Sequence, residues 1–215
     1  MSEFIDLSHP LSDGLPSFPG DPQLAIKVHN TLPQAGYNLT KITMGSHQGT
    51  HLDAPFHFFD DGKTLDRIEL GRFYGPARMI DLAPGSVLQP NTILTLESFA
   101  PFEHLFTPGA RILYRTGWDR LFGTEDFFEG FPDLALETAQ WIADKKIGLL
   151  GMDTPTPSKD FVPCHRVLLG KGIEIVIVEG LRGLERLPRD FIFIGFPLNF
   201  EGRDGSPIRA VALID

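Results

Sequence analysis

The feature that most restricts the local structure of this chain is a cluster of ionisable side chains in residues 46–58, SHQGTHLDAPFHF. Three of the chain's seven histidines and one aspartate fall there within eleven residues, all at odd-numbered positions: His47, His51, Asp53 and His57. Alternate residues of an extended chain point to the same face, so a strand or open loop would bring these side chains together. A helix would pair only the first two histidines, and Pro55 would remove one of its hydrogen bonds. The pattern therefore predicts a strand or a loop.

A straight strand would hold His47 and His51 about 13 Å apart, which is too far for two imidazoles that must each approach a zinc-like ion to about 2 Å. A shared metal site therefore requires the backbone to curl. Gly49 lies midway between them, can adopt strained torsions, and leaves space where a side chain would point at the ion. The competing explanation is that these polar residues only cap and satisfy a turn. The four-residue combination favours the metal site, because a lone histidine is more often satisfied by a neighbour.

The composition favours a single domain that acts on small molecules. The chain has 215 residues and 42% hydrophobic content, enough for one sizeable core, so one domain over residues 1–215 is expected. The formal net charge is -9 and no Lys/Arg cluster is present. This argues against nucleic acid and against anionic membrane surfaces as partners, because both require a basic footprint. A small-molecule substrate is the better expectation.

The sequence also favours a cytoplasmic protein. A single cysteine, Cys164, excludes an internal disulfide, so nothing points to an oxidising compartment. The start, MSEFIDLSHPL, has no basic n-region and no long apolar run, and no later stretch reaches membrane-spanning length.

Short apolar runs between turn residues indicate a strand-rich chain. Gly and Pro total 40 residues, spread evenly rather than gathered in a linker. The clearest helix covers residues 133–146 with Asp133 as its N-cap, and it would connect strands 112–114 and 147–152 as a crossover between parallel strands. The class is mixed α/β, and the expected strands are residues 24–29, 39–44, 77–82, 110–116, 147–152, 173–178, 191–196 and 208–214.

A metal site needs further ligands or an open position for water, and two residues far from the motif are candidates. His165 opens a short helix expected over residues 165–169. Glu179 follows the apolar strand 173–178 and directly precedes a glycine, a poor position for a core residue and a good one for a site. Regular alternation would place Glu179 on the isoleucine face of that strand. Glu174 remains the competing acid, although its mid-strand position also suits a solvated face.

The segment SHQGTHLDAPFHF resembles the H-x-G-T-H-x-D-x-P-x-H signature of the cyclase / kynurenine formamidase-like metal-dependent hydrolases. This motif is long and specific, and the resemblance extends across nearly the whole chain. It includes FIDLSHPLSDGLPSFPGDP near the start, ILYRTGW at 112–118, GMDTPTPS at 151–158, CHRVLLGKGI at 164–173 and DGSPIRAVALI near the end. The resemblance implies a strand-rich α/β domain with the swivelling β/β/α architecture of that family, assembled as a dimer or higher homo-oligomer.

The resemblance also implies the roles of individual residues. His57 would be the catalytic acid/base. His47, His51 and Asp53 would hold one divalent ion. Asp53 would also bridge to a second ion held by His165 and Glu179, so the site would contain one or two ions. Zinc is the first choice of metal, and manganese and iron(II) suit the same imidazole and carboxylate ligands.

Such a site predicts hydrolysis of an amide by metal-activated water, with His57 moving the proton. No covalent intermediate is required. The chain has no G-x-S-x-G elbow for a serine nucleophile, and Cys164 is expected to be a small buried filler.

The predicted substrate is aromatic, because the chain has 18 phenylalanines and three of them flank the motif or the SFPGDP segment: Phe18, Phe56 and Phe58. N-formylkynurenine is the first choice, which would make the protein an arylformamidase. A cyclic aryl amide, as for an isatin hydrolase, is the alternative within the same family. A non-catalytic metal-binding protein on the same scaffold is the alternative of another class. The presence of His57 argues against that last possibility, because metal binding alone does not need it.

Overall fold

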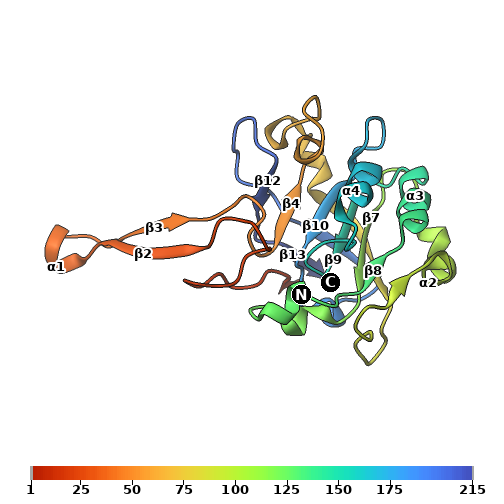
Figure 1. Ribbon diagram of the computed structural model, residues 1–215, viewed down its shortest axis with the longest axis horizontal. Coiled ribbons are helices and arrows are strands. Elements are labelled where there is room, and N and C mark those ends of the chain that lie inside the picture. The colour runs from red at the N-terminus through yellow and green to blue at the C-terminus, as the bar shows by residue number, and fades with distance from the viewer. Residues whose placement is uncertain (1, 215) are drawn as a thin grey trace.

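A mixed sheet of nine strands runs through the molecule (Figure 1). The computed structural model describes residues 2–214. The strands of the sheet, in chain order, are β1 (Glu3–Asp6), β4 (His51–Asp53), β5 (Tyr74–Asp81), β7 (Arg111–Arg115), β9 (Leu149–Met152), β10 (Val176–Glu179), β11 (Asp190–Ile194), β12 (Gly205–Pro207) and β13 (Val211–Ile214). In space the order is β1-β13-β11-β5-β7-β9-β10-β4-β12. Strands β5, β7, β9 and β10 are parallel, and the strands on both sides of them are antiparallel.

The remaining elements are short and lie around this sheet. The helices are α1 (Leu32–Ala35), α2 (Leu96–Phe99), α3 (Leu136–Asp144) and α4 (Phe161–Leu169). Two further strand pairs are β2 (Ala25–Asn30) with β3 (Leu39–Thr43), and β6 (Ile93–Leu94) with β8 (Asp133–Leu134). The short 3-10 helices are η1 (Pro55–His57), η2 (Leu65–Arg67), η3 (Leu70–Arg72), η4 (Ala100–Leu105), η5 (Trp118–Leu121), η6 (Glu125–Phe128) and η7 (Leu184–Arg186).

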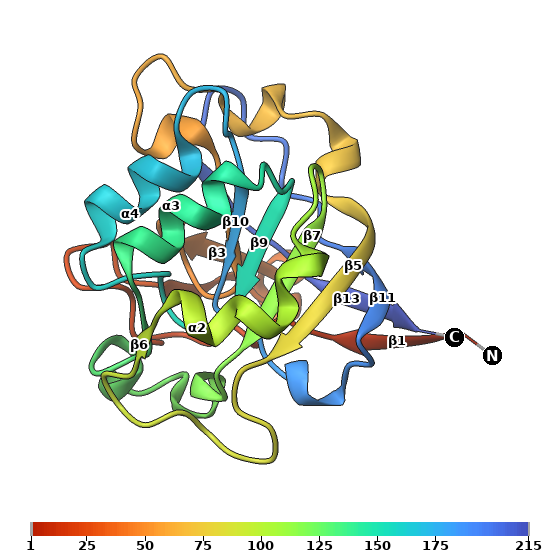
Figure 2. The ribbon, with the colours of Figure 1, turned by 90° about the vertical axis from the view of Figure 1, so that its right-hand side faces the viewer.

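Each face of the large sheet carries its own hydrophobic cluster. Helices α3 and α4 lie side by side over β9 and β10 (Figure 2), and Ile142, Leu168 and Ile177 belong to the cluster beneath them. The opposite cluster takes side chains such as Leu52 and Val178 from every strand of the sheet except β12, so the sheet curls around it. Alternation along the parallel strands β5, β7, β9 and β10 thus divides their residues between two cores.

The predicted mixed α/β, strand-rich class is confirmed, and so is the crossover helix. Strands β7 and β9 are parallel neighbours, and α3 lies between them in sequence. The predicted N-cap is wrong, because Asp133 belongs to β8 and the N-cap of α3 is Ala135. The side chain of Asp133 instead accepts hydrogen bonds from Oγ of Ser158 and from the backbone N–H of Lys159. The local sequence gives no sign of these distant partners.

Two boundaries near the predicted site differ from expectation. Helix α4 begins at Phe161 rather than at His165, so His165 lies in its second turn. Strand β10 begins at Val176 rather than at residue 173, because Glu174 adopts a left-handed backbone with a φ of 51°. The chain therefore turns before it enters the sheet.

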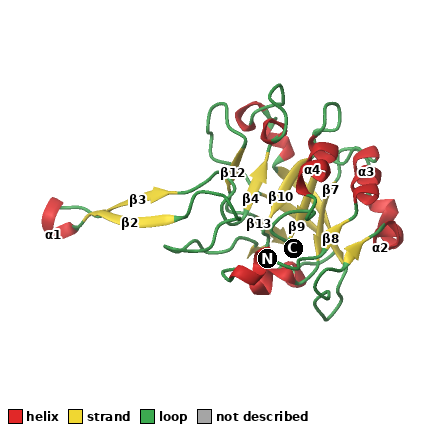
Figure 3. Ribbon diagram, viewed as in Figure 1, coloured by secondary structure: helices red, strands yellow, loops and turns green. Residues whose placement is uncertain are grey.

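The predicted strands 24–29 and 39–44 form β2 and β3, which leave the body as a long two-stranded arm with α1 at its tip (Figure 3). Every residue from 32 to 43 is exposed. Within residues 2–214, the structure contains no helix with the length and apolar character needed to cross a bilayer.

Candidate metal centre

Two antiparallel strands bring three of the predicted ligands to one face of the sheet. In the ladder between β4 and β10, Glu179 lies opposite His51 and Ile177 lies opposite Asp53. Opposed residues share a face, and alternate residues of a strand point the same way. The predicted position of Glu179 on the isoleucine face is therefore confirmed, and that face is the one covered by α4, whereas Leu52 points to the other core.

His47 lies before β4 and returns to it because the chain turns at Gly49, whose φ is 67°. The predicted curl is present, since the rings of His47 and His51 have centroids 5.0 Å apart. The Nδ1 atom of His47 is 2.7 Å from Oδ1 of Asp53. The predicted reason for the glycine is wrong in one respect, because a Cβ there would approach Cδ2 of Leu11 to 2.6 Å rather than point at an ion.

Helix α4 supplies His165 from above the strands. Its Nδ1 donates a hydrogen bond to the carbonyl oxygen of Phe161, one turn earlier, at 2.7 Å. This bond fixes the ring so that Nε2 faces the carboxylates. Nε2 lies 3.1 Å from Oε1 of Glu179 and 3.3 Å from Oδ2 of Asp53. The structure thus brings together all five predicted ligands from three separate parts of the sequence.

The competing acid lies elsewhere. Glu174 forms an ion pair with Lys63 at 2.7 Å, and its backbone carbonyl accepts a hydrogen bond from Arg72. The left-handed backbone at Glu174 breaks the alternation that would connect it to Glu179. Of the two acids, only Glu179 reaches the histidines.

Burial makes the charges of this cluster strongly interdependent. Asp53 and Glu179 have side chains only 1% and 6% exposed. Burial alone would raise the pKa of each carboxyl, but the surrounding histidines outweigh it and lower both pKa values. Conversely, burial opposes the charged imidazoles, but the carboxylates raise the pKa of His47 to about 9 and that of His165 to about 10 in the metal-free protein.

The donor set fits a divalent ion. Imidazole and carboxylate are the ligands of zinc and manganese sites. Two buried atoms of the cluster, Nε2 of His51 and Oδ2 of Asp53, have no hydrogen-bond partner among the described residues. Ligand atoms lie within 4.8 Å of one another in two groups that share Asp53, one with His47 and His57 and the other with His51 and Glu179. The pairing of His51 with Glu179 differs from the predicted first ligand set, in which His51 accompanies His47.

His57 borders the cluster without being buried in it. It ends the short helix η1, its side chain is 30% exposed, and its ring stacks on that of His47 with centroids 3.9 Å apart. Burial lowers the pKa of His57, and the charges of His47 and His165 lower it further against the opposing effect of Asp53. A neutral imidazole beside the ligands can accept a proton near neutral pH.

A cavity of about 430 Å³ opens over these residues, and six phenylalanines contribute to its wall. Phe18 and Phe58 line it as predicted, whereas Phe56 is not among its lining residues. Within residues 2–214, no lysine or arginine lines it. Sequence reasoning missed four further phenylalanines of the wall: Phe122, Phe127, Phe128 and Phe161. Of these, Phe161 could have been found, because it lies one helical turn before His165.

Asp204 is the other residue that sequence reasoning missed. Its Oδ2 atom lies 2.7 Å from Nε2 of His47, 2.8 Å from Oγ of Ser46 and 3.9 Å from Nδ1 of His57. The available signal was its position in DGSPIRAVALI, one of the segments that carry the family resemblance.

Comparison with known proteins shows the family of this chain. Residues 5–159 match the family model described as "Putative cyclase", and the chain belongs to this cyclase family. The matched region contains the motif around His47 and ends before His165.

The relatives match nearly the whole chain. A kynurenine formamidase of Bacillus cereus is 36% identical over 214 residues, which span 98% of this chain and 97% of the relative. A kynurenine formamidase of Bacillus cytotoxicus is 33% identical with the same coverage of both chains. Among solved structures, isatin hydrolase A from Ralstonia solanacearum is 25% identical with a TM-score of 0.87, covering 100% of this chain and 92% of its own.

Proposed function

We propose that this chain is a metal-dependent hydrolase of small aryl amides, and that N-formylkynurenine is its first-choice substrate. The observation that carries the proposal is the position of His57, beside a buried cluster of histidines and carboxylates at the base of an aromatic cavity. Five residues would hold one or two divalent ions: His47, His51, Asp53, His165 and Glu179. Zinc is the first choice and manganese the alternative, because both accept these donors.

When bound, a divalent ion supplies a water of lowered pKa and polarises the carbonyl of the substrate. His57 would accept the proton of that water while the oxygen attacks the formyl carbon, and would then donate it to the leaving aryl nitrogen. The carbon–oxygen bond forms, the carbon–nitrogen bond breaks, and formate and an aryl amine leave. Phe18 and Phe58 would pack against the aryl ring. The kynurenine formamidase relatives support this choice of reaction.

A second substrate class is favoured by a specific observation. Among the described residues, the lining of the cavity contains no lysine or arginine, so it offers no permanently charged cation for the carboxylate of an amino-acid substrate. An uncharged cyclic aryl amide such as isatin has no carboxylate that needs a cationic partner, and it could pack against the phenylalanines of the cavity. The likeness to isatin hydrolases supports this alternative.

The test is metal analysis of the purified protein followed by hydrolysis assays on N-formylkynurenine and isatin. We expect at least one zinc or manganese ion per chain, and a higher kcat/KM for N-formylkynurenine. The variant Asp53→Ala should lose both metal and activity, because both candidate groups of ligand atoms share Asp53. Metal retained in full by Asp53→Ala would contradict the site. Metal binding without hydrolysis of either substrate would favour the non-catalytic alternative.

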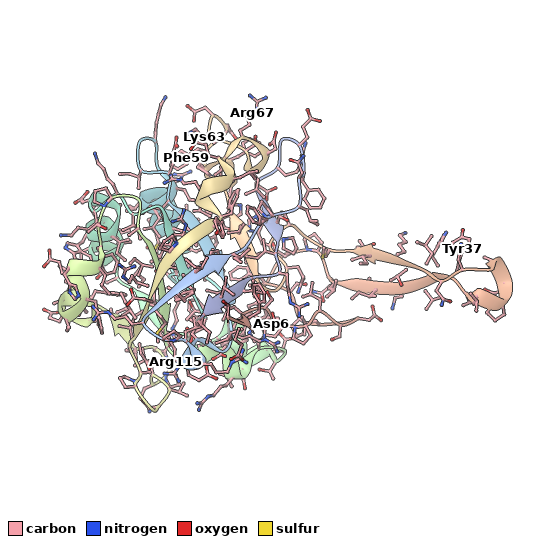
Figure 4. All side chains as sticks on the ribbon, turned by 180° about the vertical axis from the view of Figure 1, so that it is seen from behind. Asp6, Tyr37, Phe59, Lys63, Arg67 and Arg115 are labelled. Carbon is pink, nitrogen blue, oxygen red and sulfur yellow. The ribbon has the colours of Figure 1, made fainter. Side chains whose placement is uncertain are left out.

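We also propose that the chain is a homo-oligomer, a dimer or higher, and that it is cytoplasmic. The arm formed by β2 and β3 supports the first proposal. A two-stranded hairpin is marginally stable alone, yet this one leaves Val28 74% and Ile42 56% exposed, and Tyr37 lies near its tip, far from the body (Figure 4). Residues 24–45 contain two lysines and no acid, whereas the whole chain has a net charge of -9. The acidic body of a second copy is therefore a suitable partner for the arm.

A further inference from the structure

Asp204 reaches the metal centre from the last third of the chain. It directly precedes β12, the edge strand beside β4. Its carbonyl oxygen accepts a hydrogen bond from the backbone N–H of Ala54 at 2.8 Å, and the next residue, Gly205, lies opposite Asp53 in the ladder. The backbone of Asp204 and of the residue after it is thus tied to β4, which carries two of the candidate ligands, and to Ala54 directly after it.

The two nitrogens of His47 face two different carboxylates. Nδ1 lies 2.7 Å from Oδ1 of Asp53, and Nε2 lies 2.7 Å from Oδ2 of Asp204. An ionised carboxylate accepts hydrogen bonds and cannot donate them. Oδ2 of Asp204 also accepts a hydrogen bond from Oγ of Ser46 at 2.8 Å, so this oxygen acts as an acceptor. Nε2 of His47 must therefore carry the proton in that bond, which leaves Nδ1 as the nitrogen available to an ion beside Asp53.

The position of the His47 ring is restricted by its neighbours as well. On one side it stacks on His57, with centroids 3.9 Å apart. At the edge of the ring that carries Cε1 and Nε2 lies Gly205, where a Cβ would approach Cε1 of His47 to 2.6 Å and Nε2 to 3.0 Å. The glycine therefore gives the ring room to reach Asp204. A space and an acceptor on the same edge of the ring are what a positioned histidine requires.

We propose that Asp204 is the positioning residue of His47, and that it sets the metal affinity of the centre by holding this imidazole in one tautomer and one orientation. Metal-ligating histidines generally donate their second ring N–H to an outer carboxylate or carbonyl, and loss of that partner costs about 10- to 100-fold in metal affinity or activity. The inference rests on the proposed function only in assuming that the cluster binds a divalent ion. It does not depend on which substrate is hydrolysed.

A merely structural role makes a different prediction. Asp204 also accepts a hydrogen bond from Oγ of Ser46 at 2.8 Å, so it could serve only to tie its loop to the chain before the motif. Ser46→Ala breaks that tie and leaves the contact with His47 in place. A second acid offers a matched control for charge, because exposed Asp66 accepts a hydrogen bond from the backbone of Gly202, two residues before Asp204.

The experiment measures the dissociation constants of Zn²⁺ and of Mn²⁺ by chelator competition, starting from the metal-loaded protein, for Asp204→Asn, Asp204→Ala, Ser46→Ala and Asp66→Asn. Asp204→Ala should weaken binding of each ion by about 10- to 100-fold. Asp204→Asn keeps the side-chain shape and should weaken binding by a smaller factor. It keeps the test valid if the alanine variant fails to fold. Ser46→Ala and Asp66→Asn should stay within about twofold of the unaltered protein. In nitrogen-15 NMR of the zinc-loaded protein, the His47 ring should be protonated at Nε2, and Asp204→Ala should disturb that assignment.

The outcomes separate this inference from the proposed function. Weakened metal binding in both Asp204 variants, with normal binding in both controls, supports it even if no tested amide is hydrolysed. Unchanged Zn²⁺ and Mn²⁺ affinities in the Asp204 variants would overturn it even if the protein is an active arylformamidase. An equal loss in Ser46→Ala would also overturn it, because the loop tie would then account for the effect.

Discussion

Metal binding by this protein should release protons, and the number released follows from the charges of the cluster. In the metal-free protein the pKa of His47 is raised to about 9 and that of His165 to about 10, and the pKa of His51 is also raised well above its usual value. In each case burial favours the neutral imidazole, but the nearby carboxylates, including that of Asp53, outweigh burial and raise the pKa. At pH 7 we therefore expect His47 and His165 to be protonated, and the raised pKa of His51 acts in the same direction. They pair with three carboxylates, including Asp204.

A metal ion binds only the neutral form of an imidazole. Full loading of the site at pH 7 must therefore displace about three protons, one from each histidine ligand. Each displaced proton makes the apparent metal affinity fall about tenfold for every unit by which the pH drops, so three give about a thousandfold between pH 8 and pH 7. His47 loses only the proton on the nitrogen that faces Asp53, because Asp204 holds the other.

The assay is isothermal titration calorimetry of the metal-free protein with Zn²⁺ at pH 7 in buffers of different ionisation enthalpy. The slope of the observed enthalpy against the buffer enthalpy gives the number of protons released. The His57→Ala variant is the control, because burial lowers the pKa of His57 and its ring should contribute no proton. Release of fewer than about one proton per fully loaded chain would refute the reasoning, since the carboxylates would then not hold the histidines charged.

Four further predictions follow from the same geometry. The free energy of unfolding of the metal-free protein should fall as the pH rises, because folding raises the pKa values of His47 and His165 above the usual value of about 6.5. The stabilisation from these two groups is complete below about pH 6.5 and is lost as the pH rises through about 9 to 10. Urea denaturation at several pH values measures it. His57→Ala should keep its metal while kcat falls by about 10²- to 10⁴-fold, and an unaltered rate would remove His57 from the mechanism. Glu179→Gln should lower the metal content measured by elemental analysis, whereas Glu174→Gln should not. Equal losses in the two variants would contradict the role of Glu179 as the acidic ligand. Ile42→Asp on the exposed arm should shift the oligomer towards monomer in light scattering without changing the circular dichroism spectrum, and an unshifted mass would exclude this face of the arm.

The parts of the site that could be predicted from sequence are those fixed by local pattern. The odd spacing of His47, His51 and Asp53 requires only an extended chain with one turn, and the structure has that form. The position of Glu179 followed from alternation in an apolar strand, which needs no knowledge of the partner strand. Placement of the crossover helix likewise followed from its own periodicity and its flanking strands.

The parts that failed depend on partners distant in sequence. Asp204 lies 157 residues from His47 and comes next to a three-residue strand, Gly205–Pro207, whose glycine and proline are poor strand formers. No periodic signal identifies such an element, and its pairing with β4 is visible only in three dimensions. The prediction of Asp133 as an N-cap failed for a related reason. Asp133 belongs to the two-residue strand β8, which pairs with a distant strand, and the helix begins after it.

The distribution of the ligands makes the metal centre sensitive to the register of the sheet. His51 and Asp53 lie on β4, which pairs with β10 on one side and with β12 on the other. Because the side-chain period of a strand is two, a slip of one residue in either ladder would turn a set of groups away from the site. The same slip would move Leu52 out of its core, where it is fully buried. Hydrophobic packing on one face of β4 therefore fixes the geometry of the ligands on the other, and an ion that joins β4, β10 and α4 would in turn stabilise the native register against the alternatives.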